Sequence, residues 1–235
     1  MHKRLWVVFV LLLMVSLTAG CSKESKKEVE EKQQDVSITV TDYKFTPGTI
    51  NTEVGTLLEF KLKNSAQQKH EMVIDTPEGQ YELEVDAGKE VNFGIKFRLP
   101  GTYAIMCELP GHLDQGMKGE IVVKGKGTVA KFAKGEGGGG EEKMQDIKMT
   151  LSDFKFDPGT VTTGVDTLLE FGVKNSATQK HEMVIDGKSA EFEVEVEPGQ
   201  DLGFAVKYRK KGTYEYKCEI PGHLEQGMKG SIVVE

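Results

Sequence analysis

Apolar and polar residues alternate in short runs along most of this chain. In the first half of the chain the runs cover residues 36–40, 57–62, 72–74, 81–85, 91–97, 103–106 and 121–123. A period of two is typical of strands with one buried face, and turn-forming pairs such as Pro47-Gly48 and Asn64-Ser65 separate the runs. About seven or eight strands within about 90 residues predict an all-β fold, a two-sheet Greek-key sandwich.

The second half of the chain repeats the first at an offset of about 111 residues. Residues 35–124 align with residues 146–235 without a gap, and a little over half of the paired residues are identical. Such self-similarity indicates a tandem duplication. We therefore expect two sandwich domains, at 35–124 and 146–235.

The N-terminal residues have the pattern of an export signal. Residues 1–4 include two basic side chains, residues 5–17 are almost wholly apolar, and small residues precede Cys21. The apolar run is shorter than the roughly 20 residues that a membrane-spanning helix needs, which disfavours an uncleaved anchor. Leu17-Thr18-Ala19-Gly20-Cys21 resembles the lipobox of bacterial lipoproteins. This resemblance implies cleavage of residues 1–20, lipid attachment at Cys21, and an extracytoplasmic protein anchored to a bacterial membrane.

Two segments outside the repeats are poor in apolar residues. Residues 21–34 are rich in Lys and Glu and are predicted to form a flexible tether. Residues 125–145 are rich in glycine, and about 20 such residues have a root-mean-square span of roughly 25 Å. We expect this linker to let the two domains approach and separate.

The charge balance disfavours nucleic acid as a partner. The whole chain has a net charge of -7, and removal of Lys3 and Arg4 with the signal leaves 28 basic against 37 acidic side chains, a net charge of -9. An acidic surface suits solubility, and it also suits a basic redox partner.

Each repeat contains a distant His followed by a compact Cys, His and Met group. The predicted metal ligands are His70, Cys107, His112 and Met117 in the first copy and His181, Cys218, His223 and Met228 in the second. Two imidazoles, one thiolate and a weak thioether are the donors of a blue copper site. We therefore expect one copper ion in each domain, cycling between Cu(I) and Cu(II).

The local sequence explains how these side chains could converge. Tyr103, Ile105 and Cys107 alternate along a predicted strand, so the thiol stands where the strand ends. Pro110-Gly111 then turns the chain so that His112 can face the same point.

Both repeats resemble the cupredoxins, the family of plastocyanin and azurin, in nearly their whole length and in the Cys-x4-His-x4-Met motif. The resemblance implies the ligands named above and an electron port at the exposed edges of His112 and His223. The residues that would surround these ports are Pro110, Leu113, Pro221 and Leu224. The chain departs from the family where Glu71 follows the distant His and Glu108 follows the Cys, because plastocyanins and azurins usually have Asn after that His.

Several other interpretations compete with copper. Buried Cys and Met are often simple core residues, and Cys107 and Cys218 could form a disulfide in an oxidising compartment. Zinc accepts Cys and His, although a thioether does not suit it. All four His residues of the mature chain are already assigned as ligands, which leaves none for a catalytic copper and disfavours an enzyme.

The favoured function is one-electron transfer at the outer face of a membrane, with a cytochrome or a membrane oxidoreductase as partner. The alternative is copper buffering, delivery or sensing.

Overall fold

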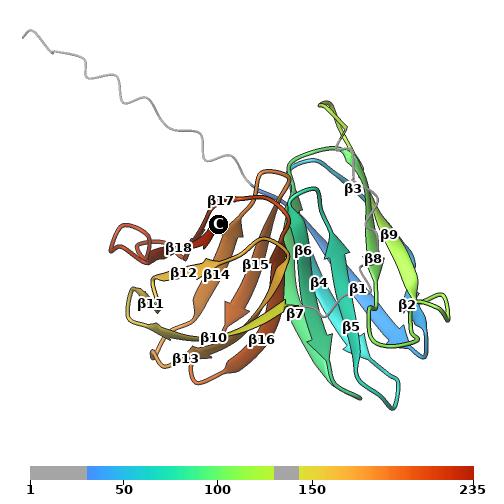
Figure 1. The fold of residues 1–235 in the computed structure, drawn as a ribbon, viewed down its shortest axis with the longest axis horizontal. Helices are drawn as coiled ribbons and strands as arrows, with labels where there is room; N and C mark the ends of the chain where they lie inside the picture. The colour runs from blue at the N-terminus through green and yellow to red at the C-terminus, as the bar shows by residue number, and fades with distance from the viewer. Residues whose placement is uncertain (1–30, 130–142) are drawn as a thin grey trace, which may run out of the picture. The chain divides into compact units, whose positions relative to one another are not determined.

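The computed structural model describes residues 31–129 and 143–235, and all of its regular elements are β-strands (Figure 1). The strands of the first copy are β1 (Lys32–Thr41), β2 (Lys44–Thr46), β3 (Thr49–Glu53), β4 (Thr56–Asn64), β5 (His70–Asp75), β6 (Gly79–Val85), β7 (Glu90–Phe97), β8 (Gly101–Met106) and β9 (Lys118–Lys124). Those of the second copy are β10 (Lys143–Ser152), β11 (Lys155–Asp157), β12 (Thr160–Thr163), β13 (Thr167–Asn175), β14 (His181–Asp186), β15 (Ala190–Val196), β16 (Asp201–Tyr208), β17 (Gly212–Lys217) and β18 (Lys229–Val234). Within the described residues, no helix has the length and apolar character needed to cross a membrane.

Each copy is a sandwich of two mixed sheets, as the sequence predicted. In the first copy one layer has the order β2-β1-β4-β7 and the other has the order β6-β5-β8-β9-β3. The pair β1 and β4 and the pair β3 and β9 are parallel, whereas the other neighbours within this copy are antiparallel. The second copy repeats this arrangement with the corresponding strands.

The alternating residues supply the core between the two layers. Val36, Ile38 and Val40 of β1 are buried while their neighbours along the strand are exposed or half-buried, because successive side chains point to opposite faces. Phe60 and Phe93 stack within the first core at a centroid distance of 4.7 Å. The corresponding pair in the second copy stacks at 5.0 Å. Phe192 lies between the two stacks, 6.1 Å from Phe93 and 5.5 Å from Phe204, so the aromatic cores of the two copies are continuous.

Strands also pair between the two copies, which the sequence did not predict. β7 is antiparallel to β15, and β6 is antiparallel to β16, so each sheet of one copy continues into a sheet of the other. At Gly79 the backbones of the two copies approach so closely that a Cβ atom would lie 1.7 Å from the carbonyl oxygen of Lys207. Only glycine, which has no Cβ atom, avoids this clash. The sandwiches are thus joined by backbone pairing as well as by the linker.

Charged side chains reinforce this junction. The guanidinium of Arg98 contacts the carboxylates of Asp186 and Glu191. At the equivalent place in the second copy, Arg209 donates to Asp75 at 2.6 Å. Both arginines are at most about one-third exposed, so these pairs are better shielded from water than typical surface ion pairs.

The expected and observed elements differ at their ends and in two short strands. The first-copy strands predicted from alternation all occur, whereas β2 and β3 were missed because they are only three and five residues long. β1 begins at Lys32 and β10 at Lys143, which extends strand structure into segments expected to be tether and linker. The signal sequence, Cys21 and most of the glycine-rich segment lie outside the described residues.

Candidate metal centres

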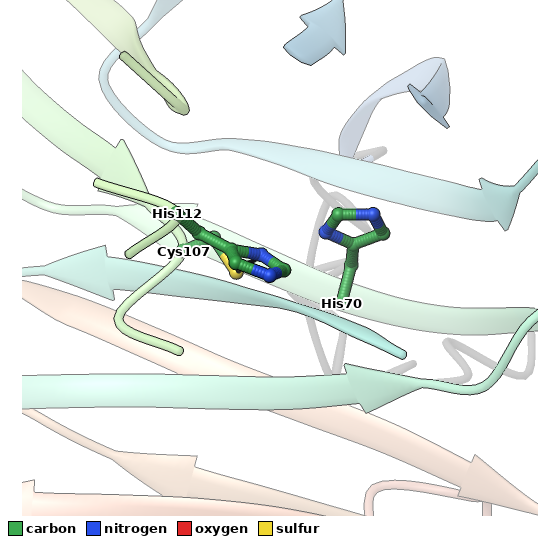
Figure 2. A group of neighbouring side chains, drawn as sticks. All are labelled: His70, Cys107 and His112. Carbon is green, nitrogen blue, oxygen red and sulfur yellow. Dashed lines mark hydrogen bonds between the residues drawn. The ribbon is translucent and has the colours of Figure 1, made fainter. Parts of the chain in front are cut away.

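The predicted His and Cys residues converge in both copies. One ligand atom from each of His70, Cys107 and His112 lies within 4.8 Å of the others, and His181, Cys218 and His223 form the same group in the second copy. Figure 2 shows the first group, with the Cys107 sulfur beside the His112 ring and the imidazole of His70 opposite. Side chains from distant parts of each repeat therefore meet at one point.

The loop between β8 and β9 is shaped by its own backbone hydrogen bonds. The amide of Cys107 donates to the carbonyl of Met117 at 3.2 Å, and the amide of Met117 donates to the carbonyl of His112 at 3.1 Å. Gly111 and Gly116 have φ values of 82° and 87°, which permit the tight turns of this loop. The second copy has equivalent bonds of 3.1 Å each between Cys218, Met228 and His223.

The donor atoms are close enough to share one ion. The Cys107 Sγ atom lies 3.2 Å from His112 Nδ1, and the Cys218 Sγ atom lies 3.3 Å from His223 Nδ1. In the second copy the Nδ1 atoms of the two imidazoles are 3.2 Å apart. The Nδ1 atoms therefore form the converging face of this centre, and Nε2 of each ring lies on the opposite side.

Burial controls the protonation of these groups. Burial, followed by the charge of His112, lowers the pKa of His70, and the same two causes act on His181 beside His223. Burial raises the pKa of the Cys107 thiol, although two backbone hydrogen bonds oppose this shift. Neutral imidazoles are ready to bind a metal, whereas the thiol needs the charge of a metal to hold it as a thiolate.

The unsatisfied atoms fit a metal ion. Both ring nitrogens of His70 are buried without a hydrogen-bond partner, and so is Nε2 of His181. Unsatisfied buried polar atoms are uncommon in folded proteins. An ion at the converging face would satisfy His70 Nδ1, and the nitrogen and sulfur donors suit copper.

The two methionines predicted as ligands are buried on the same loops as the Cys and His. Met117 and Met228 are fully buried and are hydrogen-bonded through their backbones to the Cys and His of the same loop. Cys107 and Cys218 are free thiols, so the alternative of a disulfide between them is not realised.

Glu71 links the segment of the distant His to the Cys loop. Its carboxylate accepts a hydrogen bond from the amide of Glu108, the residue after Cys107, and Gln80 donates to the Glu108 carboxylate at 3.0 Å. In the second copy the amide of Glu182 donates to the Cys218 sulfur at 3.4 Å. In the first copy a glutamate side chain therefore joins these segments at the position where the family usually has Asn, and in the second copy the backbone amide of the same position does so.

The rings predicted as electron ports are mostly buried and adjoin exposed leucines. His112 is 8% exposed and His223 is 5% exposed, whereas the adjoining Leu113 and Leu224 are 45% and 41% exposed. An exposed apolar side chain therefore lies next to each of these residues in the sequence.

Sequence reasoning missed the turn between β1 and β2. Asp42 Oδ1 lies 4.0 Å from His70 Nε2, and the ring of Tyr43 packs edge-on against His112 at 5.3 Å. The signal available in the sequence was the repetition of this turn as Asp153-Phe154 in the second copy.

Comparison with known proteins agrees with this architecture. A family model described as "Cupredoxin-like domain" matches residues 7–123 and again residues 128–234. The copper-resistant cuproprotein CopI of Rubrivivax gelatinosus is 28% identical over 120 residues, which make up 43% of this chain and 72% of CopI.

Two solved structures share a lower sequence identity with this chain than CopI does. Auracyanin A of Chloroflexus aurantiacus, a blue copper protein, is 18% identical with a TM-score of 0.35, and the match covers 39% of this chain and 99% of auracyanin A. The copper-containing nitrite reductase of Thermus scotoductus SA-01 is 16% identical with a TM-score of 0.36, and the match covers 86% of this chain and 62% of the reductase.

Proposed function

Because the chain belongs to the cupredoxin-like domain family, we propose that it carries single electrons on one type 1 copper ion in each copy, at the outer face of a bacterial membrane. The observation that carries this proposal is the convergence of two imidazoles and a thiol in both copies. A copper ion with these ligands supplies a reversible one-electron couple.

The protein's contribution is a rigid and largely dry set of ligands. His70 begins β5 in one layer, and the remaining donors lie on a loop whose backbone hydrogen bonds fix its shape. His70, Cys107 and Met117 are fully buried and His112 is only 8% exposed, so the centre is largely shielded from water. Ligands that keep one geometry in both oxidation states allow fast electron exchange, and the edge of His112 is the route to a partner.

The number of His residues also supports an electron carrier that catalyses no reaction of its own. The chain has five His residues, of which His2 lies in the predicted signal and four belong to the two centres. No further imidazole is left to bind a catalytic copper. The partner we propose is a cytochrome or a membrane oxidoreductase that accepts or donates one electron.

The lipid anchor is the part of the proposal that places the carrier at a membrane. Two or three acyl chains on Cys21, each methylene worth about 0.8 kcal/mol, would hold the protein there stably. Metabolic labelling with a radioactive fatty acid tests this, because labelled native protein and an unlabelled Cys21→Ala variant are expected. Native protein that carries no label would refute the proposed lipid anchor.

Copper buffering, delivery or sensing is the second candidate, and the similarity to CopI, whose name refers to copper resistance, favours it. The two functions differ in how readily copper leaves. A carrier should be intensely blue when oxidised and should exchange electrons with a cytochrome while retaining its copper. A delivery protein should instead lose its copper to a chelator or to a metal-free acceptor protein during the time of the electron-exchange measurement.

The deciding experiment uses a soluble chain that begins at residue 22. It is loaded with Cu(II), and its spectrum, copper content and electron exchange with reduced cytochrome c are measured. Two blue coppers per chain and rapid electron exchange support the carrier. A colourless protein would overturn the assignment of type 1 centres.

A further inference from the structure

The two-residue turn between β1 and β2 contacts both imidazoles of the first centre. Asp42 Oδ1 is 4.0 Å from His70 Nε2, and the Tyr43 and His112 rings meet at 5.3 Å with an interplanar angle of 89°. The turn between β10 and β11 repeats this pattern. Phe154 meets His223 at 5.2 Å and 87°.

The backbone of this turn disfavours the aromatic residue that occupies it. Tyr43 has a φ of 62° and Phe154 a φ of 58°. When the second central residue of a β-turn has positive φ, Gly or Asn is preferred there, because other side chains crowd the backbone. Both copies nevertheless have an aromatic residue at this position, which suggests that its ring has a function there.

Another turn of the same chain shows the contrast. Gly55 and its counterpart Asp166 also have positive φ, at 78° and 55°. That position carries glycine in one copy and a small polar residue in the other, as the backbone prefers. Neither residue belongs to the groups of candidate ligands. The aromatic ring is therefore associated with the turn that meets the imidazole and not with positive φ in general.

The acid of the turn lies beside an unsatisfied ring nitrogen. Nδ1 of His181 faces the converging donors, which leaves Nε2 on the far side, and Nε2 of both His70 and His181 is buried without a partner. A histidine that binds a metal through one nitrogen usually donates its other N–H to a carboxylate or carbonyl. Asp42 Oδ1 is 4.0 Å from Nε2 of His70, so a small movement of its exposed side chain would bring it within hydrogen-bond distance.

We propose that these turns are positioning devices for the ligands: Asp42 fixes the tautomer of the distant His70, and Tyr43 and Phe154 hold the ring of the loop His edge-on. The proposal rests on the proposed function, because it treats the four His residues as ligands. Since Phe154 makes the same contact as Tyr43, the ring is the shared requirement and the hydroxyl is not.

The test measures the first centre alone, in the soluble chain that begins at residue 22 and carries Cys218→Ser. Tyr43→Gly and Tyr43→Asn remove the ring and suit the positive φ, whereas Tyr43→Phe keeps the ring. Asp42→Ala removes the acceptor and Asp42→Asn keeps one. Asp166→Gly is the matched control, because it relaxes a similar backbone without touching either centre.

Three measurements are made on each variant. The first is the unfolding temperature. The second is a titration and voltammetry series that gives the copper affinity and the reduction potential. The third is the set of NMR signals of the imidazoles in the metal-free and Cu(I)-bound protein. NMR reports the tautomer of His70 and the effect of the Tyr43 ring on the His112 protons without any electron-transfer assay.

The expected result separates backbone strain from ligand positioning. Tyr43→Gly, Tyr43→Asn and Asp166→Gly should keep or raise the unfolding temperature, but only the Tyr43 variants should shift the His112 protons and the potential. Asp42→Ala should lower copper affinity about 10-fold or more and release the His70 N–H to solvent exchange, while Asp42→Asn and Tyr43→Phe stay close to the parent.

Two outcomes would overturn the proposal. One is that Tyr43→Gly and Tyr43→Asn leave the imidazole signals of the metal-free protein unchanged. The other is that Asp42→Ala leaves the His70 tautomer and the copper affinity unchanged. If the parent chain binds no copper at all, the proposed function fails, and the metal-free NMR still reports whether Tyr43 orders the His112 ring.

Discussion

The rings of Tyr81 and Phe192 stack face to face, with a centroid distance of 4.9 Å and an interplanar angle of 9°. The two residues occupy the same position in the two repeats, 111 residues apart. A residue that meets its own counterpart marks an isologous contact, the kind found on the two-fold axis of a dimer. The repeats are therefore related as two subunits of a dimer within one chain.

This contact predicts that the halves stay together without the linker. A protease site inserted between Gly138 and Gly139 should allow the chain to be cut while both fragments elute as one particle in size-exclusion chromatography. Arg98→Asp would face the carboxylates of Asp186 and Glu191, so the cut variant should separate more readily. Fragments of the cut parent that elute separately would contradict the interface.

The two metal centres should be lost one at a time, because each copy has its own complete group of donors. Cys107→Ser is expected to abolish one blue centre and leave about half of the absorbance and one blue copper per chain. Cys218→Ser should give the mirror result. A colourless single variant would show that one ion is shared between the copies.

The axial position should control the reduction potential. Met117→Gln replaces a soft thioether with a harder oxygen, which stabilises Cu(II) more than Cu(I), so the potential of the first centre should fall while copper is retained. Met72→Leu is the control, because Met72 is equally buried and such a swap conserves its volume. Voltammetry in a Cys218→Ser background measures this potential, and an unchanged or raised value would place Met117 outside the coordination sphere.

The contribution of Glu193 to stability should fall as the pH rises from about 4.5 to about 8. Burial, followed by the charges of Glu182 and Glu59, raises the pKa of Glu193 from 4.5 to about 8. Between these values the unfolded chain releases the Glu193 proton and the folded chain retains it, which favours unfolding. Glu193→Gln should therefore raise the unfolding temperature at pH 8 but not at pH 4. Glu215→Gln, at an exposed position, serves as the control. If Glu193→Gln changed the unfolding temperature equally at both pH values, the raised pKa of Glu193 would be refuted.

The sequence predicted those parts of the site that depend on local spacing. Cys107, His112 and Met117 lie on one loop, and their repetition in the second copy linked them to the distant His70. The turn at Tyr43 was not found, because its relation to His112 depends on how β1 lies across the sandwich.

The strand pairing between the two copies could not be predicted from the sequence either. β6 and β7 have the alternation of ordinary half-buried strands, and that pattern does not say which strand lies beside them. The glycine at position 79 gave a weak signal of close approach, but glycine in a strand has several causes.

The pairing of β6 with β16 and of β7 with β15 has a consequence for how the protein behaves in a crowded compartment. In one copy alone, β6 and β7 would each end a sheet and expose a row of free amides and carbonyls, which is a template for joining strands of other chains. Duplication covers four such edges at once within a single molecule. The fused pair is thereby protected from sheet-to-sheet aggregation on that side, whatever its concentration.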